Sequence, residues 1–148
     1  MTGVRALRRH GAALMSCMLL LALAWCAPAR AQDPRTTVVQ GAAREWLVAA
    51  DRLDAKKTWD TAGTKFKQAI TLDGWAEALR AAREPLGNAD QRALVSTRFD
   101  TQFAGAPPGD YALVQYRTAF AKKSEGHETL TMEREADGAW RVIGYFIR

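Results

Sequence analysis

The chain has 148 residues, of which 21 are basic and 16 acidic, so its formal net charge is +5 at neutral pH. Four of the 21 basic residues lie in the first 31 residues, and all 16 acidic residues lie after them. Removal of that segment would leave a net charge of +1, which argues against nucleic acid as a partner.

The N-terminus has the pattern of a secretion signal. Arg5, Arg8 and Arg9 precede an uncharged run over 11–28, and Ala29-Arg30-Ala31 then places small residues where a signal peptidase requires them. We expect cleavage after Ala31, and therefore a periplasmic or secreted protein. The apolar run is shorter than the roughly 20 residues that span a bilayer, so no stable membrane anchor is expected after cleavage.

Both cysteines, Cys17 and Cys26, fall within the predicted signal. Lipidation of Cys26 is disfavoured because the bulky Trp25 precedes it, but this alternative stays open. A chain cleaved after Ala31 would contain no cysteine, and so neither a disulfide nor a thiolate metal site.

A flexible leader over 32–38 is expected to precede one domain over 39–148. From Val39 on, apolar residues recur at intervals of three and four, which is typical of helices. The pattern predicts three helices, over 39–54, 59–70 and 72–82. Thr71 and Asp73 are suited to cap the last of them, and Asp60 is interpreted as a helix-start charge. Each predicted helix carries one tryptophan on its apolar side: Trp46, Trp59 and Trp75.

After Gly87 the apolar period changes to two, which indicates strands. Four are predicted, over 95–103, 111–121, 128–135 and 140–147. Asp137-Gly138 is typical of a hairpin turn, and Gly144 suggests a bulge in the last strand. The predicted fold class is α+β, with three helices packed on one face of a four-stranded antiparallel meander.

Several segments together resemble a family of exported bacterial proteins, domain of unknown function family 4019. The most specific is the closing block Trp140-Arg141-Val142-Ile143-Gly144-Tyr145-Phe146. Arg44-Glu45-Trp46-Leu47 and Gly109-Asp110-Tyr111 also contribute. The resemblance implies a small exported domain without an assigned activity. The order of helices before sheet is further similar to the cone-shaped nuclear-transport-factor-2-like and cystatin-like folds, as an analogy of fold alone.

Motifs for chemistry are absent from the sequence, which contains no Gly-x-Ser-x-Gly, no phosphate-binding loop and no paired-histidine metal motif. His127, the one histidine after the predicted signal, is interpreted as an exposed loop residue. Glu128, Glu133 and Glu135 are interpreted as solvated charges on the outer face of a strand. The sequence therefore predicts no catalytic, cofactor-binding or metal-binding residue.

The aromatic residues are the one feature with functional promise. They are first of all expected to form the core, because helices on a single sheet must bury aromatic rings. If the cone is open at one end, some of them could line a pocket for a small apolar ligand or contact an envelope protein. The candidates for that role are Trp59, Trp75, Tyr116, Trp140 and Tyr145.

The preferred functional hypothesis is a non-enzymatic binding or interaction module, because no catalytic constellation is found. The alternative is an enzyme of the cone fold, in which one buried carboxylate transfers a proton on a small apolar ligand. Asp60 and Asp100 are the example carboxylates for this alternative. An inward-facing carboxylate with a raised pKa in a cavity would favour the enzyme.

Overall fold

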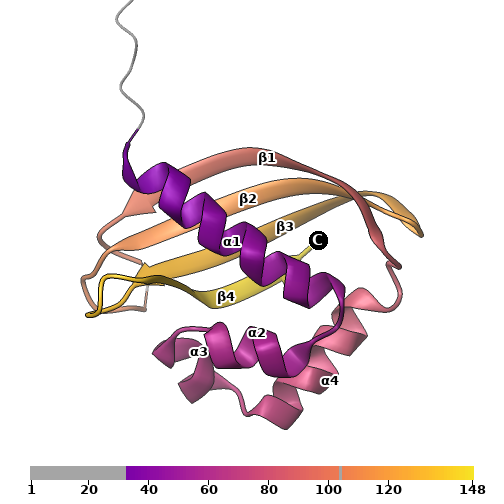
Figure 1. The fold of residues 1–148 in the computed structure, drawn as a ribbon, viewed down its shortest axis with the longest axis horizontal. Helices are drawn as coiled ribbons and strands as arrows, with labels where there is room; N and C mark the ends of the chain where they lie inside the picture. The colour runs from indigo at the N-terminus through magenta and orange to yellow at the C-terminus, as the bar shows by residue number, and fades with distance from the viewer. Residues whose placement is uncertain (1–32, 104) are drawn as a thin grey trace, which may run out of the picture. The chain divides into compact units, whose positions relative to one another are not determined.

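The structure is a computed structural model that describes residues 33–103 and 105–148. The predicted signal peptide, its cleavage point and both cysteines lie outside these residues. The described chain is α+β as predicted, with four helices followed by four strands (Figure 1). These elements are α1 (Arg35–Asp51), α2 (Ala55–Thr61), α3 (Thr64–Ala69), α4 (Leu72–Arg83), β1 (Ala89–Asp100), β2 (Tyr111–Phe120), β3 (Lys123–Arg134) and β4 (Trp140–Ile147).

The strands form one antiparallel meander in the order β1-β2-β3-β4. Helix α1 crosses one face of this sheet, and α2, α3 and α4 gather beyond β4 (Figure 1). The inner face of β2 carries the buried side chains that the sequence predicts, among them Val114, Tyr116 and Phe120. None of the helices in the described part of the chain is long and apolar enough to cross a membrane.

Helix α1 begins at Arg35, four residues before the apolar periodicity starts. The Asp33 carboxylate accepts a hydrogen bond from the Arg35 backbone N–H at 2.9 Å and pairs with its guanidinium at 2.7 Å. This local pairing stabilises a helix start that the hydrophobic periodicity does not indicate. The second half of the stretch predicted as a leader is therefore helical.

The predicted helix over 59–70 is wrong, because the chain breaks at Ala62-Gly63 into α2 and α3. The Gly63 N–H donates to the Val142 carbonyl of β4 at 2.8 Å. A Cβ at Gly63 would lie 2.8 Å from Ile143 Cγ2, so the close approach to the strand needs glycine. The break thus covers part of the edge of β4, which would otherwise lie open to other strands.

Strand β4 contains an irregularity opposite Thr131 and Met132, as Gly144 suggests. Val142 is buried, but beyond the irregularity it is Tyr145 that pairs with the buried Leu130. Phe146 is 64% exposed. Uninterrupted alternation would place Phe146 on the same face as Trp140 and Val142, but one extra residue reverses the alternation and Phe146 lies on the other face.

The boundaries of two other strand predictions also shift. β1 begins at Ala89 and ends at Asp100, so Arg92 belongs to the strand. β3 begins at Lys123 rather than at residue 128, so residues 123–127 already belong to the strand that pairs with β2. Asp137-Gly138 forms the predicted turn, with Gly138 at φ +82°.

Candidate functional site

Four charged side chains meet beneath the C-terminal end of α1. Arg83 is the last residue of α4 and Asp51 the last of α1, while Arg92 lies on β1 and Glu128 on β3. Arg83 Nη1 donates to Glu128 Oε1 at 2.9 Å, and Arg83 Nη2 bonds Asp51. Arg92 Nε donates to Glu128 Oε2 at 2.6 Å, and its two other nitrogens donate to Asp51 at 2.8 and 2.9 Å. The two positive and two negative charges balance.

Two hydroxyl groups complete the surroundings of Glu128, which is fully buried. Tyr145 OH donates to Oε1 at 2.6 Å, and Thr118 Oγ1 donates to Oε2 at 2.5 Å. Each carboxylate oxygen therefore accepts one hydrogen bond from an arginine and one from a hydroxyl. Such saturation offsets the cost of burying a charge.

Burial and neighbouring charges determine the protonation states of Tyr145 and Asp51 in this network. Burial raises the pKa of the Tyr145 hydroxyl far above its ordinary 10.0, and the negative charge of Glu128 adds to the shift. Burial alone would raise the pKa of Asp51, but Arg92 and Arg83 outweigh it and hold that pKa below 3.8. Near neutral pH Tyr145 stays protonated and Asp51 ionised, so the hydrogen bonds keep fixed directions.

The interpretation of Glu128 as a solvated charge is wrong. Glu128 precedes the inward-facing Leu130 by two residues on the same strand, and this spacing is the signal that places it on the inner face. Glu133 and Glu135 are not freely solvated either, since Lys65 pairs with Glu133 at 2.5 Å and Arg141 with Glu135 at 2.8 Å.

Three further charged or titratable candidates lie away from this network. His127 is exposed as expected, although it lies on β3 rather than in a loop. Asp60 is exposed and pairs with Lys56 on the surface of α2. Asp100 ends β1, where it accepts a hydrogen bond from the Gln102 N–H at 3.0 Å. Glu128 is therefore the buried carboxylate that the enzyme hypothesis requires. Both of its oxygens already accept hydrogen bonds from arginines.

Aromatic rings fill the space between α1, α4 and the sheet. The Trp46 ring lies 5.8 Å from Trp75 and 5.1 Å from Tyr145, and Phe66 packs edge-on against Trp75 at 4.9 Å. Trp75 Nε1 also donates to Thr58 Oγ1 at 2.7 Å. Trp75 and Tyr145, both candidates for a pocket, therefore lie in the core.

The other three candidates lie apart from one another. Trp59 is half-buried on α2, donates to the Ile70 carbonyl at 3.1 Å and carries Lys67 Nζ over its ring at 5.5 Å. Tyr116 is buried on β2. Trp140 lies at the start of β4 and packs against Phe99, with 5.8 Å between the ring centroids.

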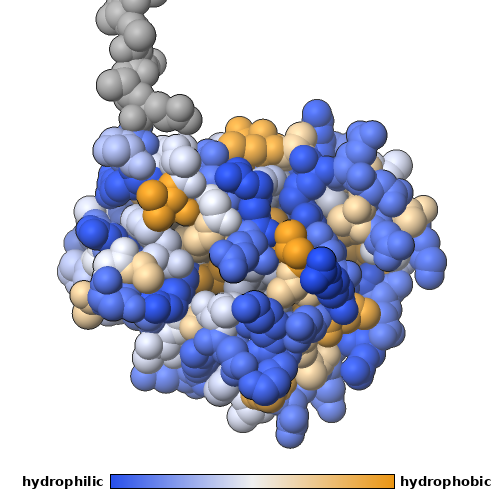
Figure 2. Space-filling view, in the orientation of Figure 1, coloured by the Kyte–Doolittle hydropathy of each residue, from blue (hydrophilic) through white to orange (hydrophobic). Residues whose placement is uncertain are grey.

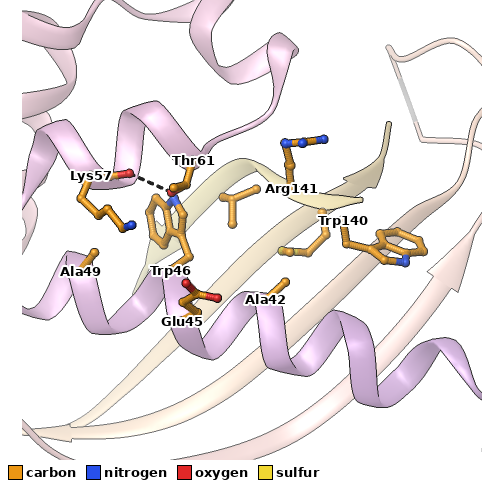
Figure 3. Close-up of a pocket in the computed structure, with 10 residues that line it drawn as sticks. Ala42, Glu45, Trp46, Ala49, Lys57, Thr61, Trp140 and Arg141 are labelled. Carbon is orange, nitrogen blue, oxygen red and sulfur yellow. Dashed lines mark hydrogen bonds between the residues drawn. The ribbon is translucent and has the colours of Figure 1, made fainter. Parts of the chain in front are cut away.

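A cleft of about 130 Å³ opens between α1, α2 and β4 (Figure 3). Its floor is apolar and includes Trp46, whose Nε1 is fixed by the Thr58 carbonyl at 2.9 Å. The Trp140 indole points away from Trp46 (Figure 3), so this residue lines one end of the cleft. The remaining lining residues are Ala42, Glu45, Ala49, Lys57, Thr61, Met132, Arg141 and Val142.

The cleft has opposite charges at its rim. Glu45 of α1 and Lys57 of α2 are exposed, and within the described residues neither side chain makes an ion pair. Arg141 is already held by Asp137 at 2.6 Å. The site therefore combines an apolar floor with one acidic and one basic group that make no ion pair among the described residues, an arrangement suited to holding an amphipathic group.

Comparison with protein families places residues 42–145 in DUF4019, described as a protein of unknown function. The chain belongs to the DUF4019 family. The resemblance inferred from the sequence is therefore confirmed. No curated protein matches the chain.

Solved structures match the chain at low sequence identity. A ketosteroid isomerase-like protein from Erwinia carotovora atroseptica matches with a TM-score of 0.52 and 15% identity, over 78% of this chain and 96% of that one. Aln2 from a Streptomyces species matches with a TM-score of 0.49 and 13% identity, over 79% and 92%. ActVI-ORFA from Streptomyces coelicolor matches with a TM-score of 0.48 and 12% identity, over 76% and 95%. The first of these confirms the nuclear-transport-factor-2-like fold of this DUF4019 protein.

Proposed function

We propose that this DUF4019 protein is a non-enzymatic binding module of the cell envelope, which holds one small apolar group in the cleft between α1, α2 and β4. The observation that carries the proposal is the saturation of Glu128. Its oxygens accept hydrogen bonds from two arginines and two hydroxyls, so the carboxylate has no free lone pair aimed at a ligand. A general base must be within reach of the proton that it removes.

The size of the cleft limits what it can hold. Apolar cavities of about 150 Å³ in proteins accept a benzene ring, so a cleft of 130 Å³ suits one aromatic ring or one branched aliphatic group. Glu45 and Lys57 at the rim suit a polar or zwitterionic continuation of the same molecule. The occupant is then either a small amphipathic ligand or an apolar side chain of a protein partner.

Filling the cleft is expected to abolish binding. Ala42→Phe places a ring in the lining, whereas Ala78→Phe adds the same ring on an exposed site of α4. The protein would be purified from its native envelope, and co-purifying small molecules and proteins quantified by mass spectrometry. We expect one stoichiometric occupant with wild type and with Ala78→Phe, and its loss with Ala42→Phe.

Two results would contradict this proposal. One is an occupant that Ala42→Phe retains at the wild-type ratio. The other is chemical conversion of the occupant by the purified protein, which would indicate an enzyme instead.

Export is proposed from the sequence pattern of residues 1–31. Basic residues, an apolar run and Ala29-Arg30-Ala31 together predict that the envelope form begins at Gln32. N-terminal sequencing of protein from fractionated cells measures this directly. Finding Met1 or Thr2 at the start of the abundant form would exclude cleavage after Ala31.

A further inference from the structure

Helix α1 is fastened to strand β1 at two places. Gln40 Nε2 donates to Thr97 Oγ1 at 2.9 Å, and Asp51 accepts from Arg92 at 2.8 and 2.9 Å. Asp51 follows Gln40 by eleven positions, which corresponds to about 16 Å of helix. Side chains at intervals of three and four point to one side of a helix, so Arg44 and Val48 lie on the stripe between the two fastenings.

Several side chains of α1 and β1 along this stretch, which we call the α1–β1 seam, are exposed. Arg44 is exposed and Val48 is 49% exposed on the helix side. On the sheet side Leu94 is 43% exposed and pairs directly with Tyr116 of β2. A register irregularity follows Leu94 and leaves Val95 59% exposed. On the face drawn in Figure 2, apolar patches are small and separated by hydrophilic side chains.

Tyr116, the β2 partner of Leu94, carries a hydrogen-bonding group without a partner among the described residues. Tyr116 is 3% exposed, and its hydroxyl is a buried polar atom without a hydrogen-bond partner in the described part of the chain. Leaving such a group unsatisfied is costly, and most buried polar atoms in native proteins have a partner. The hydroxyl can therefore donate a hydrogen bond to an acceptor that the described part of the chain does not supply.

The charged groups near this hydroxyl are the guanidinium groups of Arg44 and Arg92 and the carboxylate of Glu128. Burial raises the pKa of Tyr116, while the positive charges of Arg44 and Arg92 act in the opposite direction. Arg92 is committed to Asp51 and Glu128. Among the described residues, Arg44 makes no ion pair and no side-chain hydrogen bond, so its charge is open to a ligand.

We propose that the α1–β1 seam binds a monocarboxylate with a short apolar chain. The carboxylate accepts a hydrogen bond from the Tyr116 hydroxyl and pairs with Arg44, and the apolar chain lies on Val48 and Leu94. One cation and one hydroxyl donor match a single negative charge, whereas a phosphate would bring a second charge without a partner.

This site is separate from the cleft of the proposed function. Ala42, Trp46 and Ala49 of α1 line the cleft, whereas Arg44 and Val48 lie on the other flank of the same helix. Because Arg44 and Val48 are exposed, their side chains can move aside to admit a ligand to the covered Tyr116 hydroxyl.

Titration of the purified, isotope-labelled protein with sodium hexanoate, followed by NMR, tests the proposal. Hexanoate is expected to shift amide signals of 44–48, 92–97 and 114–118 in a saturable way, and hexan-1-ol to bind about tenfold more weakly or less. Tyr116→Phe and Arg44→Gln are each expected to weaken hexanoate binding about tenfold or more. The control Arg98→Gln removes an exposed arginine of β1 and should bind as wild type does.

Stability measurements show whether the hydroxyl lacks a partner in the free protein. Tyr116→Phe is expected to leave the melting temperature without ligand unchanged or raised, because it removes an unsatisfied buried group. A fall of several degrees would mean that internal water already satisfies the hydroxyl and would overturn the proposal. Equal binding of hexanol, or unchanged binding by Tyr116→Phe, would overturn it too. Ala42→Phe should leave hexanoate binding intact, which separates this test from that of the cleft.

Discussion

Replacing Glu128 with glutamine is expected to lower the free energy of unfolding by about 3–5 kcal/mol. The substitution preserves the shape of the side chain but removes the charge that faces Arg83 and Arg92. Arg83 is 3% exposed, so water cannot replace the lost partner. Of the four charges in the network, Asp51 then supplies the one remaining negative charge for two guanidinium groups. Urea denaturation followed by tryptophan fluorescence measures the loss.

The control for this substitution lies on the same strand. Glu125 is 65% exposed on its side chain, and Glu125→Gln should change stability by no more than about 0.5 kcal/mol. The double variant Arg83→Met, Glu128→Gln restores charge balance and should recover part of the loss, with a coupling of about 0.5–3 kcal/mol. A loss below about 1 kcal/mol for Glu128→Gln, or strictly additive effects in the double variant, would show that the network is solvated rather than buried.

The ionic network also explains why the function is proposed at the periphery of the fold. In this chain the interior below the sheet is occupied by the Trp46, Trp75 and Tyr145 rings and by the arginine-carboxylate network. Groups that could meet a ligand are therefore left on the two flanks of α1. On one flank Glu45 of α1 faces the same cleft as Lys57 of α2, and on the other flank lies Arg44; among the described residues none of the three makes an ion pair.

Regular, locally determined elements could be predicted from the sequence. The strand over 140–147 and the helix beginning after Thr71 have the predicted bounds to within a residue. Thr71 Oγ1 accepts from the Gly74 N–H at 3.2 Å, as expected of a helix cap. These features depend on periodicity and on side chains within one turn, both of which are visible in a single sequence.

Features that depend on distant contacts could not be predicted in the same way. The break at Gly63 is fixed by a hydrogen bond to Val142, far along the chain on the last strand. Glu128 is buried because Arg83 and Arg92 come from other elements to meet it, and a glutamate alone on a strand is ordinarily a surface residue. The alternation in β4 fails at the irregularity before Tyr145, which Gly144 indicates but does not place in register.

Replacing Trp140 with alanine is expected to lower the free energy of unfolding by about 3–5 kcal/mol. Trp140 is 7% exposed, and its ring packs edge-on against Phe99, which in turn carries the Arg35 guanidinium at 4.2 Å. Removal of the indole would therefore leave a cavity between β4, β1 and the start of α1. Urea denaturation of wild type and variant, with the denaturant slope checked for constancy, measures the change.

Phe146→Ala is the matched control, because it removes an aromatic ring from the same strand on the other side of the irregularity. Phe146 is 64% exposed, so its loss should cost less than about 1 kcal/mol. If β4 alternated without interruption, Phe146 would share the buried face of Trp140 and both substitutions would be equally severe. A loss below about 1 kcal/mol for Trp140→Ala would instead make Trp140 an exposed platform. Trp140 would then contribute to the cleft as a contact for the occupant rather than as part of the core.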